Sequence, residues 1–256
     1  MNDLTQTAGR KRRGWRFWGL CFLAVFCTTC LIDNLWERSG SNEWKLVSDA
    51  NEMRVWSLKT PGNSLLKYRV KLHLDAELSD IVFFLTDLQS GADVGAYDID
   101  RLEQVSTPRA TYVYDTYKVK LPWPIGVIEA MIINLYTQDP QTRQVNISIY
   151  AAPNKKPRDA RVTRVVHLSN SWIITPLESG GVDVESVSEM DLGVPYVLAN
   201  LAMPGVLADE VNKMRTVIKT DRYRNGRPAF IRELHEDAHV AGGGQQPAAL
   251  TAEIRH

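Results

Sequence analysis

Strict alternation of apolar and polar residues is the feature that most restricts how this chain can fold. Leu66, Tyr68, Val70, Leu72 and Leu74 alternate with lysine, arginine and histidine side chains. A period of two places the apolar residues on one face of a β-strand and the polar residues on the other. The pattern therefore predicts a strand with one face in a core and one face in solvent.

Further strands are predicted where β-branched and aromatic residues recur, at residues 112–120, 145–149, 162–168, 171–175 and 182–190. One-sided strands in series are typical of a meandering antiparallel sheet. We therefore expect a single curved sheet rather than the alternating strands and helices of a parallel one.

Two segments have helical spacing instead, residues 78–88 and residues 195–218. The second contains Pro204-Gly205, which should kink or break the helix. Its apolar stripe comprises Leu198, Leu201, Leu207, Val211 and Met214. A helix laid over a curved sheet encloses space between the two. We predict an α+β fold in which a curved antiparallel β-sheet is closed by a long C-terminal helix around an apolar cavity.

The N-terminus carries a basic cluster, Arg10 to Arg16, followed by an apolar run from Phe17 to Ile32. The run is shorter than the roughly 20 residues of a membrane-spanning helix. It is longer than the roughly 7–15 apolar residues of a secretory signal. We predict a basic cytoplasmic tail over residues 1–16 and a transmembrane anchor or signal segment over residues 17–36. Both alternatives place the domain outside the cytoplasm, tethered to the membrane if uncleaved and secreted or periplasmic if cleaved.

The rest of the chain divides into one domain, residues 43–219, and a polar, disordered tail, residues 220–256. All three cysteines lie in the apolar run, so the domain has neither disulfides nor thiolate metal ligands. His235-Glu236-Asp237-Ala238-His239 matches a zinc-protease pattern, but the predicted tail offers no domain to enclose a metal. We expect no metal and no cofactor. Thirty basic and thirty acidic residues cancel, so net charge gives no reason to expect nucleic acid as a partner.

Five stretches in chain order resemble the StAR-related lipid transfer (START) domain. They are Glu43-Trp44-Lys45-Leu46 with Met53–Trp56, Ile81–Asp87, Leu121-Pro122-Trp123-Pro124 with Glu129, Val162–Pro176, and Met190–Asn200. Four features depart from that pattern. Ile128 stands where the family has arginine, Glu129 where it has aspartate and Tyr97 where it has tryptophan, and the last stretch lacks one glycine. The resemblance implies a helix-grip fold whose last helix closes a tunnel around one lipid.

Candidate polar positions facing such a tunnel are Tyr112, Tyr114, Glu129, Arg164 and Asn200. The apolar stripe of the last helix would line the remainder. A buried Arg164 must be paired, and Glu129 is the expected partner. The alternatives are a purely structural ion pair, core packing of the tyrosines, and an Asn200 that braces the kink before Pro204.

We therefore predict a membrane-tethered lipid-binding or lipid-transfer protein with no catalytic activity. Two alternatives stay open at this point: a cyclase- or hydrolase-like enzyme on the same fold, or a module that binds a peptide or partner protein. The basic loop Lys155-Lys156-Pro157-Arg158 is expected to be a solvated turn, with contact to anionic lipid headgroups as the alternative.

Overall fold

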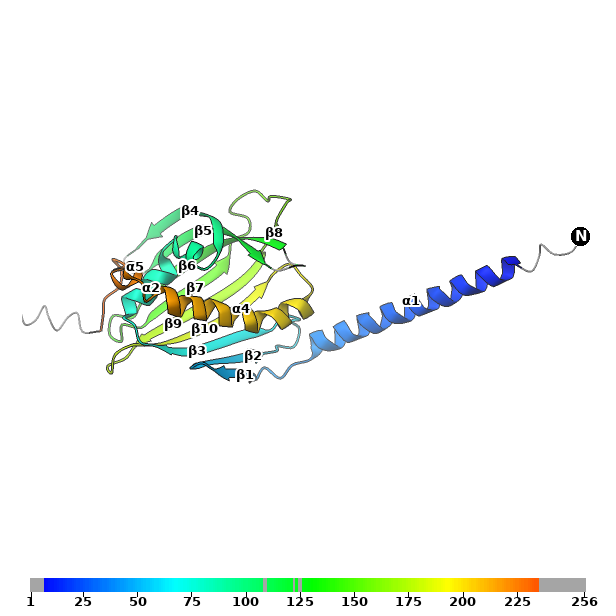
Figure 1. The fold of residues 1–256 in the computed structure, drawn as a ribbon, viewed down its shortest axis with the longest axis horizontal. Coiled ribbons are helices and arrows are strands. Elements are labelled where there is room, and N and C mark those ends of the chain that lie inside the picture. The colour runs from blue at the N-terminus through cyan, green and yellow to red at the C-terminus, as the bar shows by residue number, and fades with distance from the viewer. Residues whose placement is uncertain (1–6, 108–109, 122, 124–125, 235–256) are drawn as a thin grey trace, which may run out of the picture.

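A ten-stranded sheet, antiparallel except for one short strand, with one long helix across it makes up the folded part of the protein (Figure 1). The computed structural model describes residues 7–107, 110–121, 123 and 126–234, without the side chains of residues 7–17, 19 and 20. The strands are β1 (Trp44–Ala50), β2 (Met53–Leu58), β3 (Lys67–Leu74), β4 (Ala96–Ser106), β5 (Thr111–Leu121), β6 (Gly126–Gln138), β7 (Val145–Ala151), β8 (Thr163–Arg164), β9 (His167–Pro176) and β10 (Val182–Asp191). The helices are α1 (Thr7–Arg38), α2 (Leu78–Thr86), α3 (Ser90–Asp93), α4 (Tyr196–Val217) and α5 (Asp221–Arg224).

The strand order is β1-β2-β3-β10-β9-β7-β6-β5-β4, and the short β8 pairs with β6 in parallel. All other pairings are antiparallel, which confirms the predicted α+β architecture. The strand predicted over residues 162–168 is interrupted between β8 and β9, because β8 pairs with β6 whereas β9 pairs with β7.

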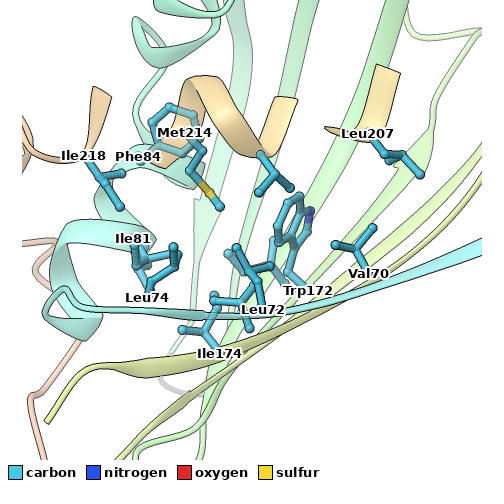
Figure 2. Close-up of a cluster of buried hydrophobic side chains, with 14 of the residues drawn as sticks. Val70, Leu72, Leu74, Ile81, Phe84, Trp172, Ile174, Leu207, Met214 and Ile218 are labelled. Carbon is cyan, nitrogen blue, oxygen red and sulfur yellow. The ribbon is translucent and has the colours of Figure 1, made fainter. Parts of the chain in front are cut away.

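The core lies between α4 and the face of the sheet that it covers, here called the inner face. Val70 and Leu72 of β3 and Trp172 and Ile174 of β9 point toward α4 (Figure 2). Each of these four side chains is buried. The alternation of residues 66–74 thus directs the apolar set toward α4, as the sequence predicts.

The other helices lie at the two ends of the domain (Figure 1). α2 and α5 lie at one end, where Tyr223 of α5 is buried against Phe83 and Phe84. Residues beyond the expected boundary at Lys219 pack against the domain through Tyr223. The buried Tyr223 holds this segment against the domain. The other residues of the segment are mostly polar, so the sequence did not indicate this contact. The remainder of the predicted tail, with the His235–His239 motif, lies outside the described residues.

α1 projects from the opposite end of the domain (Figure 1). It begins earlier than the predicted segment 17–36 and includes basic residues from Arg10 onward. In the described part of the chain, no helix has a stretch both long and apolar enough to cross a bilayer. The side chains of residues 17, 19 and 20, which belong to the predicted anchor, lie outside the description.

Candidate functional site

Strand register decides which side chains of β5 and β6 face α4. Residues that pair directly across antiparallel strands lie on the same face of the sheet. Tyr117 pairs with Ala130 and Asp115 with Ile132, and the pairing continues through β7 to Trp172 of the inner face. The inner positions of β5 are therefore Val113, Asp115, Tyr117 and Val119.

Tyr112 and Tyr114 occupy the alternate positions and lie on the outer face. Tyr112 is 38% exposed, and the Nζ of Lys155 lies 4.0 Å from the ring centroid of Tyr114. The expected inward orientation of both tyrosines is wrong. Tyrosines occur on both faces of β5, so the alternation of its residues does not identify the inner face.

Glu129 and Arg164 form the predicted buried ion pair, but on the outer face. Arg164 donates from Nε to Glu129 Oε2 at 3.1 Å, and their side chains are 4% and 8% exposed. Arg164 also donates to the backbone carbonyls of Pro153 (3.0 Å), Lys156 (2.6 Å) and Pro157 (2.8 Å). The inward orientation expected for this pair is wrong, because Glu129 alternates with the inner residues of β6. Arg164 pairs beside it in β8, and the loop after β7 covers both side chains. The contacts show an ion pair that holds a loop.

A polar cluster that the sequence did not single out lies on the inner face instead. Arg101 of β4 donates to Asp115 Oδ1 at 2.9 Å, and Asn134 of β6 donates to Asp115 Oδ2 at 3.2 Å. Arg101 also donates to the carbonyl of Thr86 at 3.2 Å. Asp115 and Asn134 are buried. Asp115 was the available signal, because it interrupts an otherwise apolar period-two pattern along β5.

Trp172 carries an indole N–H without a partner inside the core. The side chain is 4% exposed, and its Nε1 has no hydrogen-bond acceptor among the described residues. Figure 2 shows the ring beneath α4, near Val70 and Leu72. A buried unpaired donor costs about 1–3 kcal/mol. Buried polar groups in folded proteins are nearly always hydrogen-bonded, so this N–H calls for an acceptor from outside the described residues.

Tyr117 and Glu210 face each other across the space between β5 and α4. Burial raises the pKa of Tyr117 to about 12, and the Glu210 carboxylate contributes to that shift. Burial also raises the pKa of Glu210, against the opposing effect of Lys213. Both side chains nevertheless keep accessible surface. Both side chains are thus partly buried between the sheet and α4.

The raised pKa of Glu210 has a consequence for stability. A carboxyl group whose pKa is raised in the folded state makes its full contribution to protein stability at pH values below its ordinary pKa of 4.5. This contribution is lost as the pH rises through the pKa of the folded state. We expect Glu210→Gln to increase the free energy of unfolding at pH 7, with no difference from wild type below pH 4.5. Urea denaturation at both pH values measures this. Asp209→Asn, at an exposed position of the same helix, is the control, and an equal gain from it contradicts the assignment.

The buried stripe of α4 differs in its first half from the predicted one. Leu207, Val211 and Met214 are buried, as expected, whereas Leu198 is 38% and Leu201 is 78% exposed. Ala199 and Met203 take their places against the sheet. Leu198 and Leu201 therefore lie on the solvent side of the helix.

Asn200 fastens α4 to the segment between β2 and β3. Its Oδ1 accepts from the backbone N–H of Leu66 at 3.0 Å, and its Nδ2 donates to the carbonyl of Ser64 at 3.1 Å. Pro204 has no N–H for the Asn200 carbonyl, and the hydroxyl of Tyr68 donates to that carbonyl at 2.7 Å. α4 continues through Pro204 because this bond replaces the lost one. The side chain of Asn200 thus holds α4 to residues 64–66, and its carbonyl is satisfied by Tyr68.

Metal ligation finds no support in the described part of the chain, where no cluster of three or more His, Cys, Asp or Glu side chains could hold an ion. The polar side chains of the described inner face include the Arg101–Asp115 ion pair with Asn134, the hydrogen-bonded Ser186 and Asn170, and the indole of Trp172.

Comparison with known proteins gives the fold a name. No family model matches the sequence. An uncharacterised protein of Pseudomonas aeruginosa is 23% identical over 164 residues, which cover 62% of this chain and 79% of that protein. A STAR-related lipid transfer protein from Xanthomonas axonopodis superposes with a TM-score of 0.61 at 20% identity, covering 69% of this chain and 99% of that structure. Human StAR-related lipid transfer protein 5 gives a TM-score of 0.59 at 13% identity, covering 78% and 97%. The chain therefore has the fold of the StAR-related lipid transfer domain, as the sequence resemblance implied.

Proposed function

We propose that this protein binds one lipid-type hydrophobic molecule between α4 and the inner face of the sheet, and that α1 attaches it to a membrane. The unpaired indole N–H of Trp172 is the observation that carries the binding site. A ligand oxygen at this position would remove the cost of the buried donor.

The remaining inner face suits the apolar part of such a ligand. Packing around the β2, β3 and β10 residues is tight, and Val55, Val70 and Val184 are each at most 2% exposed. Six apolar or aromatic side chains at the border of this core are only partly buried: Tyr117, Val119, Leu121, Ile149, Ala151 and Met190. Apolar walls with few polar groups are typical of small-molecule sites.

Membrane attachment is proposed from the surface of α1. Large apolar side chains are exposed all along its described part: Trp18, Phe22, Leu23, Val25, Phe26, Leu31, Ile32 and Leu35. A helix that is apolar all round lacks the polar face of a solvent-exposed helix, and a lipid environment covers such a surface. The proposal includes the orientation expected from the basic cluster, with the N-terminus in the cytoplasm and the domain outside.

Native mass spectrometry of the full chain, with organic extraction, tests the binding site. We expect one adduct of lipid mass per chain. Trp172→Phe should reduce ligand affinity by about tenfold, since a net hydrogen bond contributes about 0.5–1.5 kcal/mol. It should also stabilise the ligand-free protein, because it removes the buried donor.

Trp56→Phe is the matched control, because Trp56 lies on the outer face of β2. Equal loss of adduct in both variants contradicts the role of Trp172. Protein that stays bare after incubation with mixed liposomes contradicts lipid binding and favours the alternative of a partner-binding groove.

A further inference from the structure

The chain that follows α5, here called the strap (residues 225–234), lies at the end of the domain opposite α1 (Figure 1). The strap forms neither helix nor strand. α5 itself is fixed in place, because its Tyr223 is buried against α2. The strap continues from this fixed point and contacts two elements, α2 and β6.

The contacts with α2 involve both ends of the strap. Gly226 lies on the ring of Phe83, where an added Cβ would come within 2.2 Å of Cδ1. Arg227 donates to the Ser79 hydroxyl at 2.9 Å. The backbone N–H of Ser79 donates to Glu233 Oε1 at 2.8 Å. Amides in the first turn of a helix have no partner within the helix, so the Glu233 carboxylate supplies an acceptor that α2 lacks.

The contacts with β6 involve its last inner residues. Phe230 stacks on Tyr136, with ring centroids 5.7 Å apart and an interplanar angle of 22°. The side chain of Gln138 accepts from the backbone N–H of Arg232 at 3.0 Å and donates to its carbonyl at 2.8 Å. Tyr136 is 3% exposed whereas Phe230 is 37% exposed, so Phe230 is the outer layer over this tyrosine.

The polar cluster of the inner face lies next to the strap. Asn134 and Tyr136 are two residues apart in β6 and therefore share the inner face. The pKa of Arg101 is raised chiefly by its hydrogen bond with Asp115, and the nearby Tyr136 hydroxyl adds to the rise. Arg101 also donates to the carbonyl of Thr86, at the last residue of α2. The strap thus joins the two elements that carry Thr86 and Asn134, and its Phe230 covers the residue beside the cluster.

The strap is held more weakly than the elements it joins. Among residues 225–234, only Gly226 is buried. Arg227 pairs with Glu77 at 2.6 Å, but the two side chains are 54% and 58% exposed, and exposed ion pairs contribute little to stability. Segments with few buried apolar contacts open locally while the rest of the domain stays folded. We therefore expect the strap to open as a unit, starting after α5.

We propose that the strap is a releasable closure, and that its opening admits a ligand to the polar cluster of Arg101, Asp115 and Asn134. The inference rests on the proposed binding of a hydrophobic molecule between α4 and the inner face. Opening would uncover the aromatic rings of Phe83 and Tyr136 immediately beside the cluster. An amphipathic ligand could then contact apolar rings and hydrogen-bonding groups at the same entrance.

Hydrogen exchange of the full chain measures the opening. The amides of Ser79 and Arg232 report on it, because each donates across one of the two strap contacts. We expect Phe230→Ala to speed exchange at both amides by about two- to tenfold, since the variant removes an aromatic pair. Exchange in β3 and β10 should keep its wild-type rates.

Tyr112→Ala is the matched control, because Tyr112 is 38% exposed, close to the value for Phe230, but lies on the outer face of β5. It should leave both reporter amides unchanged. Gly226→Ala is a second variant that acts at the other contact, where its methyl group must displace the strap or Phe83. It should change both amides in the same direction as Phe230→Ala.

Stopped-flow fluorescence with a nitrobenzoxadiazole-labelled fatty acid tests the link to ligand access. Phe230→Ala should raise the association and dissociation rate constants of this probe by the same factor as the exchange rates. The Kd should stay at the wild-type value, because the strap closes over both the free and the occupied protein. A contact that only stabilises the fold would leave both rate constants unchanged.

The outcomes separate the strap from the proposed function. Faster exchange with unchanged probe kinetics overturns its role in ligand access. Reporter amides that exchange equally in the wild type, Phe230→Ala and Gly226→Ala overturn its release as a unit. A wild-type protein that binds no probe and carries no adduct in native mass spectrometry contradicts the proposed function and the strap's role together, whereas binding at equal rates in all variants contradicts the strap's role alone.

Discussion

Glu129→Leu is expected to lower the free energy of unfolding by about 3–5 kcal/mol, because it leaves the charge of Arg164 buried without a counter-ion. The two side chains are 4% and 8% exposed, so water cannot replace the lost carboxylate. The three carbonyls that accept from Arg164 supply hydrogen bonds but no negative charge. Urea denaturation followed by tryptophan fluorescence measures the loss.

A surface ion pair supplies the control for this result. Arg161 pairs with Asp159 and is 88% exposed, so Arg161→Ala should change stability by about 0–1 kcal/mol. Glu129→Leu combined with Arg164→Met should recover part of the loss, since no unpaired charge remains. The same double variant should free the basic loop, which hydrogen exchange of residues 153–157 detects. A loss below about 1 kcal/mol for Glu129→Leu alone shows that the carbonyls suffice for Arg164.

Leu207→Ala should destabilise the protein by about 2–5 kcal/mol, whereas Leu201→Ala should stay within about 0.5 kcal/mol. The chemical change is identical, and both residues belong to α4. Leu207 is 7% exposed and faces the sheet, whereas Leu201 is 78% exposed. Truncation of Leu207 leaves a cavity in the core, and truncation of Leu201 leaves none.

Thermal or urea denaturation of the two variants in parallel measures this difference. Similar losses of stability in the two variants would mean that Leu201 also packs against the sheet, as the sequence predicted. Lipid adducts should be lost more readily from Leu207→Ala than from Leu201→Ala.

The contacts around Ser64 suggest how attachment and binding are connected. One carbonyl accepts from Trp36 of α1 and from Asn200 of α4, so the attached helix and the helix that covers the inner face share a support.

Local periodicity and chain order sufficed to predict the architecture. Residues 66–74 alternate over a whole strand, and residues 195–218 follow helical spacing to within a residue or two of α4. Each of these patterns arises from neighbours along the chain, which the sequence contains in full. The charge argument for a Glu129–Arg164 pair also held, since a buried cation needs an anion wherever it lies.

Only the tertiary structure decided which side chains form the interior. β6 has buried side chains on both faces, because the loop after β7 covers Glu129 and Arg164 on the outer face. A period-two pattern separates two faces but does not say which one lies beneath α4. Tyr112, Tyr114, Glu129 and Arg164 consequently lie outside, whereas Arg101, Asp115, Asn134 and Trp172 lie inside. Those positions follow from the pairing of strands distant in sequence, which no local pattern records.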